Sequence, residues 1–194
     1  IAGNVVALKH ATQTLLVGER LVDAFISVGI PKDVFINMYL DHDTTSRLIE
    51  ENSFDFVNFT GSLRGGIEME RAAAGTFTPV GTELGGKDPG YVMEDADLDA
   101  AVETLIDGAM FNSGQCCCGI ERIYVVESLY EKFLQKAINI VENYKLGNPL
   151  EPETTLGPMA NKRFSDEVRL QINEAVELGA TAHIEVFKND DAGT

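Results

Sequence analysis

An alternation of short apolar runs and amphipathic segments over the first 74 residues constrains the fold most strongly. Apolar runs at residues 4–8, 34–40 and 54–59 predict buried strands. Helical spacing of apolar residues follows each run, over residues 12–28, from Thr44 or Thr45 onward, and over residues 62–74. Strands that alternate with helices are typical of a parallel sheet with right-handed crossovers. We therefore expect an α/β fold that begins with part of a Rossmann-like parallel sheet.

The pattern changes after Gly81, which predicts a second domain. A short connecting strand at residues 82–84 is followed by Gly85-Gly86 and Pro89-Gly90, two pairs that are typical of turns. We predict a first domain over residues 1–84 and part of a second α/β domain over residues 85–194. Its expected elements are a strand at 91–93, a helix capped by Asp95 or Asp97 through 111, a strand at 122–126, a helix at 128–144, a loop at 147–159, a helix at 160–178 and a strand at 182–187.

Composition excludes several classes of partner. The 194 residues carry a formal net charge of −16, which argues against binding to nucleic acid or to an anionic membrane. There is no apolar run of about 18 residues, the length that a membrane span needs, and no signal-peptide pattern. The chain starts with Ile1 and ends in a polar stretch without a closing element, so we expect a fragment of a longer chain. Clustered cysteines suit a reducing compartment, which predicts a cytoplasmic protein.

All three cysteines lie side by side in the segment Phe111–Gly119, F-N-S-G-Q-C-C-C-G. Adjacent cysteines do not match the spaced pairs of tetrahedral zinc sites, and no other cysteine can complete a disulfide framework, so we predict no metal site. A glycine-flanked turn near a helix end favours the thiolate form and hence a nucleophile. The alternative is an inert buried thiol. Cys117 is the predicted nucleophile, while Cys116 and Cys118 are expected to pack away from it or to act as redox partners.

Three other features suggest a site. Glu83 is the sole carboxylate of an apolar, glycine-rich stretch, where partial desolvation would suit a general base. Lys9 directly follows a predicted strand, so it could hold a ribose or a phosphate, or be solvated. The segment Phe59–Gly66 runs from a strand through a glycine turn into a helix, which could bind an anion or merely need glycine for the turn. Its spacing is not that of the G-x-G-x-x-G fingerprint.

Taken together, the pieces L-K, F-T-G-S, E-L-G-G-K, G-Q-C-C-C and L-G-P resemble the aldehyde dehydrogenase superfamily, in order and in the spacing from Glu83 to Cys117. The resemblance covers essentially the whole chain: it implies that residues 1–84 are the second half of the NAD(P)-binding domain and residues 85–194 the first half of the catalytic domain. The segment L-K-H-A is similar to the succinate-semialdehyde branch. The resemblance also implies oxidation of an aldehyde to a carboxylic acid with NAD or NADP as cofactor, in a homo-oligomeric full-length protein. Cys117 would attack the aldehyde, and Glu83 would activate the water that hydrolyses the thioester. The residues implied to contact the cofactor are Lys9, Thr12, Gly61, Ser62, Gly66 and Leu84.

Departures from the family pattern limit these expectations. The oxyanion asparagine and the ribose-binding glutamate of the family would fall outside residues 1–194, so we expect the isolated chain to be inactive. A half-sheet also exposes unpaired strand edges, so we expect poor solubility or association when the chain is expressed alone. Thr12 replaces a glutamate of NAD-preferring members, which leaves NADP possible because a carboxylate would repel its 2′-phosphate. Residues 39–43 replace a glycine-rich loop, and Gly90 replaces an asparagine. Two alternatives remain: a non-catalytic cofactor-domain relic with redox-sensitive cysteines, and a cysteine hydrolase that uses His10, His42 or His183.

Overall fold

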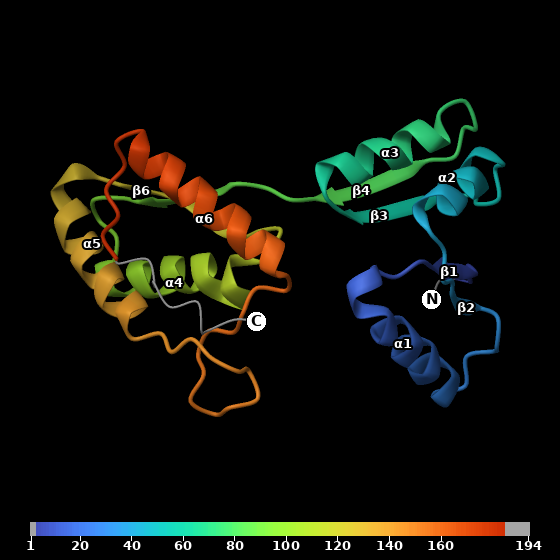
Figure 1. Cartoon of the computed structure of the whole chain (residues 1–194), viewed down its shortest axis with the longest axis horizontal. Coiled ribbons are helices and arrows are strands. Elements are labelled where there is room, and N and C mark those ends of the chain that lie inside the picture. The colour runs from blue at the N-terminus through green and yellow to red at the C-terminus, as the bar shows by residue number, and fades with distance from the viewer. Residues whose placement is uncertain (1–2, 185–194) are drawn as a thin grey trace. The chain divides into compact units, whose positions relative to one another are not determined.

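The computed structural model describes residues 3–184. These residues divide into two compact units with the boundary between Glu83 and Leu84, and each unit is described by itself (Figure 1). Helices alternate with strands in both units, and parallel strand pairs occur in both. The predicted α/β class is therefore confirmed. The assignment of the units to a cofactor-binding and a catalytic domain stays a prediction.

The first unit begins with a parallel strand pair and its crossover helix. Strand β1 (Val6–Leu8) pairs with β2 (Phe35–Asn37), and the short 3-10 helix η1 (Thr12–Thr14) and α1 (Leu15–Ser27) connect them. The chain leaves α1 through Gly29, whose φ of +90° suits the predicted helix stop. Leu8 lies opposite Asn37 in the register. The residue after β1, Lys9, therefore lies at the carboxyl edge of this pair.

The second half of this unit carries its core. Helix α2 (His42–Glu50) is followed by β3 (Val57–Gly61), α3 (Leu63–Ala73) and β4 (Val80–Leu84), with β3 paired to β4. Burying apolar side chains between α2, α3 and this sheet supplies the stabilisation. The buried side chains are Ile49, Met69, Ala72 and Ala73, with Phe54, Val57, Phe59 and Val80 packed against them.

The start expected for α2, at Thr44 or Thr45, was wrong. Asp41, not Thr44 or Thr45, is the N-cap, and its carboxylate accepts a hydrogen bond of 2.7 Å from the backbone N–H of Thr44. Thr45 instead donates its hydroxyl to the carbonyl of Asp41. A carboxylate three residues before the bonded N–H satisfies one of the free donors of the first turn. The helix therefore starts earlier than the threonines suggested.

The second unit is built on a parallel pair covered by two helices. Strand β5 (Asp88–Val92) pairs with β6 (Ile120–Val125), and α4 (Leu98–Met110) with the 3-10 turn η2 (Phe111–Gly114) connects them. Helices α5 (Glu127–Glu142) and α6 (Lys162–Glu177) follow. Asp97 caps α4 as predicted. The core lies between β5, α4 and α5 and consists of Val92, Val102, Ile106, Phe133 and Ala137.

Two strand predictions in this unit need correction. The strand expected at residues 91–93 starts earlier, at Asp88, and includes the Pro89-Gly90 pair that was expected to interrupt it. Pro89 is tolerated because it lies at a register irregularity of a two-stranded sheet. Gly90 is buried, and a Cβ there would lie 2.5 Å from Leu105 Cδ2, so the leucine fills the space of a side chain. Residues 182–184 are not a strand, and the rest of the strand expected at 182–187 lies outside the described residues.

Among residues 3–184, none of the helices combines the length and the apolar character that a bilayer crossing requires.

Candidate functional site

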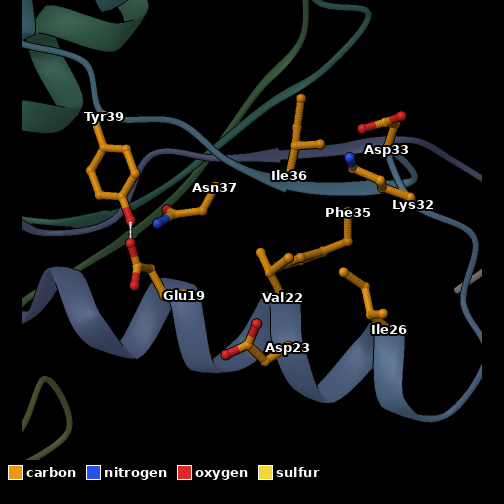
Figure 2. Close-up of a pocket in the computed structure, with 10 residues that line it drawn as sticks. All are labelled: Glu19, Val22, Asp23, Ile26, Lys32, Asp33, Phe35, Ile36, Asn37 and Tyr39. Carbon is orange, nitrogen blue, oxygen red and sulfur yellow. Dashed lines mark hydrogen bonds between the residues drawn. The ribbon is translucent and has the colours of Figure 1, made fainter.

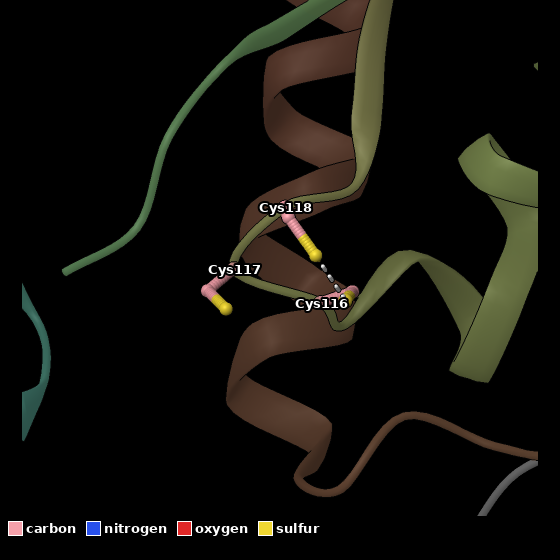
Figure 3. Close-up of side chains that lie close together, drawn as sticks. All are labelled: Cys116, Cys117 and Cys118. Atoms are coloured by element: carbon pink, nitrogen blue, oxygen red, sulfur yellow. Dashed lines mark hydrogen bonds between the residues drawn. The ribbon is translucent and has the colours of Figure 1, made fainter. Parts of the chain in front are cut away.

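The three cysteines lie on the loop that joins η2 to β6 (Figure 3). The chain enters this loop through Asn112, Ser113 and Gly114, which have φ values of 52°, 59° and 74°. Three successive left-handed residues are unusual, because only glycine adopts this conformation without steric cost. Such backbone strain persists only where the surroundings hold it in place. The contacts around the loop therefore decide where the cysteines lie.

A set of side-chain hydrogen bonds holds the loop. Ser113 donates its hydroxyl to the carbonyl of Gly157 at 2.5 Å. The amide of Gln115 donates to the carbonyl of Asn112 at 3.0 Å and accepts from the backbone N–H of Ala160 at 2.8 Å. The side-chain amide of Asn112 in turn donates to the carbonyl of Gln115 at 3.1 Å. The loop before Cys116 is therefore fixed both to itself and to the segment that precedes α6.

Gln115→Ala is expected to loosen this loop. The change removes two side-chain hydrogen bonds, each worth about 1 kcal/mol, and leaves the N–H of Ala160 without its acceptor. Amide hydrogen exchange of residues 112–118 should therefore accelerate roughly tenfold or more. Gln115→Glu is the matched control, because it keeps the acceptor for Ala160 and loses only the donor. Equal exchange rates in the wild-type and alanine chains would contradict the anchoring role.

The three sulfurs lie near one another. Every pair of Sγ atoms lies within 4.8 Å, and the sulfurs of Cys116 and Cys118 are 3.5 Å apart (Figure 3). The outer cysteines contact each other, and Cys117 lies on the other side of the turn (Figure 3). Whether they only pack there or act as redox partners of Cys117 stays a prediction. The chain turns tightly here, because the N–H of Gly119 donates to the carbonyl of Cys116 at 3.1 Å. Cys117 and Cys118 are exposed and Cys116 is half-buried, so the cluster is open to reagents.

The outer thiols differ in acidity. The backbone N–H of Cys118, and then its side chain, hold the pKa of the Cys116 thiol below its ordinary value. The pKa of the Cys118 thiol is raised instead, because this thiol is hydrogen-bonded to the sulfur of Cys116. A hydrogen bond donated to a sulfur favours its charged form and keeps the donor protonated. At a given pH, Cys116 should therefore hold more thiolate than Cys118.

This difference predicts an order of alkylation. A lowered pKa places the thiolate at lower pH, so Cys116 should react with iodoacetamide from a lower pH than Cys118. The measurement is a short labelling pulse at a series of pH values, with each site resolved by fragmentation mass spectrometry. Cys118→Ala is the control: it keeps the backbone N–H and loses the thiol, so the pH profile of Cys116 should move only partly toward that of an ordinary cysteine. Alkylation of Cys118 at lower pH than Cys116 would contradict the assignment.

The glycine pair after β4 runs beside Cys117. A Cβ placed on Gly86 would lie 3.4 Å from the carbonyl oxygen of Cys117. The next residue is tied to the strand that follows the cysteines: the guanidinium of Arg122 donates twice to the carbonyl of Lys87, at 3.0 and 2.6 Å, and the ammonium of Lys87 pairs with Glu121. The segment E-L-G-G-K is therefore held against the cysteine loop from Gly86 onward. Sequence reasoning did not assign these positioning residues.

Glu83 and Leu84 close strand β4, at the boundary of the two units. The side chain of Glu83 is exposed and that of Leu84 half-buried. The partial desolvation expected for Glu83 is therefore not found. Its role as a base and the cofactor contact of Leu84 stay predictions.

The residues expected to hold a cofactor lie at strand ends of the first unit. Lys9 is half-buried directly after β1, and Thr12 is exposed in η1. At the start of α3, Ser62 is the N-cap, and its hydroxyl accepts from the N–H of Gly65 at 3.2 Å. Gly61 is exposed in the turn, whereas Gly66 is buried and its N–H donates to the carbonyl of Ser62. Gly61 and Ser62 can therefore meet a ligand, while Gly66 serves the packing of the helix.

A pocket of about 290 Å³ lies between α1 and β2 (Figure 2). Tyr39 donates a hydrogen bond to Glu19 at one end, which raises the pKa of the phenol. The side-chain amide of Asn37 is buried beside it, against Gly18, and has no hydrogen-bond partner among residues 3–184. Nothing in the sequence indicated this pocket, because its polar residues alternate with apolar ones as on any surface helix. It is lined by Glu19, Val22, Asp23, Ile26, Lys32, Asp33, Phe35, Ile36, Asn37 and Tyr39.

Comparison with known proteins identifies the family. The sequence model described as "Aldehyde dehydrogenase family" matches residues 1–194. The chain belongs to the aldehyde dehydrogenase family. The predicted resemblance is thereby confirmed.

Individual members of the aldehyde dehydrogenase family agree with this assignment. The succinate-semialdehyde dehydrogenase [NADP(+)] of Mycobacterium avium is 33% identical over 181 residues, which cover 93% of this chain and 38% of the relative. A solved structure of Gox0499 has a TM-score of 0.95 and 35% identity, and the match covers 99% of this chain and 42% of that one. For an NAD-dependent aldehyde dehydrogenase of Sinorhizobium meliloti the TM-score is 0.86, at 34% identity over 91% of this chain and 35% of that one. The chain thus spans less than half the length of these relatives.

Proposed function

We propose that this chain is the segment of an NAD(P)-dependent aldehyde dehydrogenase that carries the nucleophile Cys117 and the general base Glu83. The family assignment supports the reaction class. The observation that carries the assignment of Cys117 is its loop: an exposed thiol on a strained turn, anchored by Gln115 and flanked by Gly86. A strained but anchored turn that presents a thiol to solvent is what a nucleophile needs.

In the proposed reaction, the thiolate of Cys117 attacks the carbonyl carbon of the aldehyde and forms a tetrahedral hemithioacetal. The backbone N–H of Cys117 stabilises the negative charge on the former carbonyl oxygen, and one such donor is worth about 3 kcal/mol. Loss of hydride from the same carbon leaves a thioester on Cys117. Glu83 then takes a proton from water, which attacks the thioester and releases the carboxylic acid and the thiol. The thioester separates oxidation from hydrolysis, so each step has a lower barrier.

The chain offers groups that suit the cofactor. Bound NAD(P) would accept the hydride. The exposed turn of Gly61 and Ser62 opens α3, where the positive end of a helix favours a phosphate, and Lys9 lies at the carboxyl edge of β1 and β2. Thr12 brings no negative charge to the position where a glutamate would disfavour a 2′-phosphate. We therefore propose that NADP is accepted as well as NAD.

Succinate semialdehyde is the first substrate to test. Relatives from Mycobacterium avium and Escherichia coli are named succinate-semialdehyde dehydrogenases, and the segment Leu8–Ala11 resembles that branch. Aldehyde-dependent formation of NADPH or NADH would be measured for the isolated chain and for a chimaera. In the chimaera, the chain replaces the matching 39% of the Escherichia coli enzyme.

Turnover is expected from the chimaera and not from the isolated chain. A chimaera that melts cooperatively yet reduces neither cofactor with any aldehyde of a graded panel would contradict the proposed function. Ester hydrolysis without a nicotinamide would favour the cysteine hydrolase. Three equally sluggish thiols would favour the non-catalytic relic.

A further inference from the structure

The connection from β2 to α2 is held by specific contacts, although its sequence departs from the family pattern. The N–H of Met38 donates to the carbonyl of Leu8 at 2.7 Å, so the hydrogen bonds between β1 and β2 continue to Met38. Asp41 is fixed as the N-cap of α2. Between these two points, the hydroxyl of Tyr39 donates to the carboxylate of Glu19 on α1. The segment that replaces a glycine-rich loop is therefore tied to β1, α1 and α2.

Tyr39 lies at the edge of its strand pair where a ligand is expected. Leu8 is the last residue of β1, and its carbonyl accepts the N–H of Met38. Lys9 and Tyr39 are the residues that follow these two partners along the chain. Ligands of open parallel α/β sheets bind beyond the carboxyl ends of the strands. Figure 2 shows the ring of Tyr39 with its hydroxyl pointing to Glu19, so an oriented ring and a lysine share this edge.

The ring of Tyr39 is both exposed and fixed. The residue is 57% exposed, although its hydroxyl is engaged by Glu19. An aromatic ring offers a flat face on which another planar ring can stack. A ring that already has its orientation loses less conformational freedom when a ligand binds, which favours affinity. Tyr39 is therefore a preorganised surface for a planar ligand.

The charge at this edge and the proposed reaction select the ligand. The half-buried Lys9 brings a positive charge, which suits a phosphate. A planar base that is linked to phosphate is a nucleotide. In the proposed reaction, the nicotinamide accepts hydride from the carbon bound to Cys117, which leaves adenine as the base of NAD(P) that the first unit can hold.

We propose that Tyr39, held in place by Glu19, is the side chain on which the adenine of NAD(P) stacks. The inference rests on the proposed function, because its ligand is the cofactor of that reaction. It goes further by naming a residue for the base, whereas Lys9 and the start of α3 were assigned to the ribose and the phosphates. The stack is non-covalent, so no bond forms or breaks. Glu19 acts through Tyr39 and is a positioning residue.

Calorimetric titration of the 194-residue chain with NADP, and with nicotinamide mononucleotide, which lacks adenine, tests the stack. Tyr39→Ala removes the ring and should weaken NADP binding on the order of tenfold or more. Tyr39→Phe keeps the ring and loses only the bond to Glu19, so it should bind NADP roughly threefold more weakly. Binding of the mononucleotide should be unchanged in both variants. Tyr91→Ala is the control, because it is the same change at a tyrosine of the second unit that is 65% exposed, and it should bind NADP like the wild-type chain.

A spectroscopic measurement tests the contact without any substitution. In the wild-type chain, nuclear Overhauser effects should connect the H2 and H8 protons of adenine with the ring protons of Tyr39. Their absence in a chain that binds NADP would overturn the proposal. So would wild-type affinity in Tyr39→Ala, or an equal loss of NADP and mononucleotide binding. Equal losses in Tyr39→Ala and Tyr39→Phe would overturn it as well, because the hydroxyl and not the ring would then be what matters.

These failures are distinct from a failure of the proposed function. In each of them the wild-type chain still binds NADP, so the proposed reaction would be unaffected. A wild-type chain that binds no NADP would also overturn the stack, and turnover by the chimaera would then decide the proposed function by itself. Circular dichroism of each variant shows whether it is folded.

Discussion

Cys117→Ser is expected to lower aldehyde-dependent NAD(P)H formation by the chimaera by a factor on the order of 10⁴ or more, because loss of a catalytic nucleophile has effects of this size. A serine hydroxyl is scarcely ionised near neutral pH and is a poor substitute for the exposed thiol. The expected change lies in the rate of the chemical step rather than in the binding of cofactor. Initial rates at saturating aldehyde, with cofactor affinity measured separately, check it.

Two comparisons separate the nucleophile from its surroundings. Cys118→Ser removes a neighbouring thiol and shows how much of the loss comes from disturbing the loop. Glu83→Gln removes the proposed base but leaves Cys117 in place, so a single burst of NAD(P)H should still form before the thioester stalls. A rate that falls less than tenfold in Cys117→Ser would mean that another group attacks the aldehyde. An unchanged steady-state rate in Glu83→Gln would show that this carboxylate does not activate the water.

The periodic elements of the fold were predictable because they depend on local patterns. The helices over residues 15–27 and 63–73 were expected from helical spacing, with Ser62 at the start of the second. The predicted ends of helices and strands were wrong where a polar contact or the size of a neighbouring side chain sets them. The carboxylate of Asp41 accepts a hydrogen bond from the N–H of Thr44, and α2 therefore starts directly after Asp41. Strand β5 runs through the Pro89-Gly90 pair, and the side chain of Leu105 occupies the space beside Gly90.

The site was predictable in its residue types but not in its arrangement. The motif around Cys117 identified the family, because a G-Q-C-C-C-G turn is specific in itself. Gln115 was missed, because its partner Ala160 lies 45 residues further along the chain. The 3.5 Å contact between the sulfurs of Cys116 and Cys118 was not predicted either. The left-handed conformation of Asn112 and Ser113 before it was also missed, because neither residue type demands it. Contacts between distant segments, which a local pattern does not encode, hold these residues in place.

Phe133→Ala should produce the largest loss of stability in the second unit. The side chain lies in the core with Val92, Val102 and Ile106 and is 6% exposed. Truncating a buried phenylalanine removes its apolar burial and leaves a cavity, which together cost about 3–5 kcal/mol. That is a large share of the total stability of a small domain, about 5–15 kcal/mol. Hydrogen exchange of the paired amides of β5 and β6 should rise accordingly, and the urea midpoint should fall.

Phe77→Ala, in the first unit, is the control for the truncation itself, because it is the same change at a side chain that is 99% exposed. Removal of an exposed ring leaves no cavity, so its effect should stay within about 0.5 kcal/mol. Phe77 keeps a positive φ of 63° in either form, and alanine retains the Cβ, so the backbone cost is unchanged. If both variants lost the same stability, burial in the core of the second unit would not be what makes Phe133 important. A loss confined to Phe133→Ala would instead show that the packing of α4 and α5 stabilises this unit. The same packing would then support β6, which follows the cysteine loop.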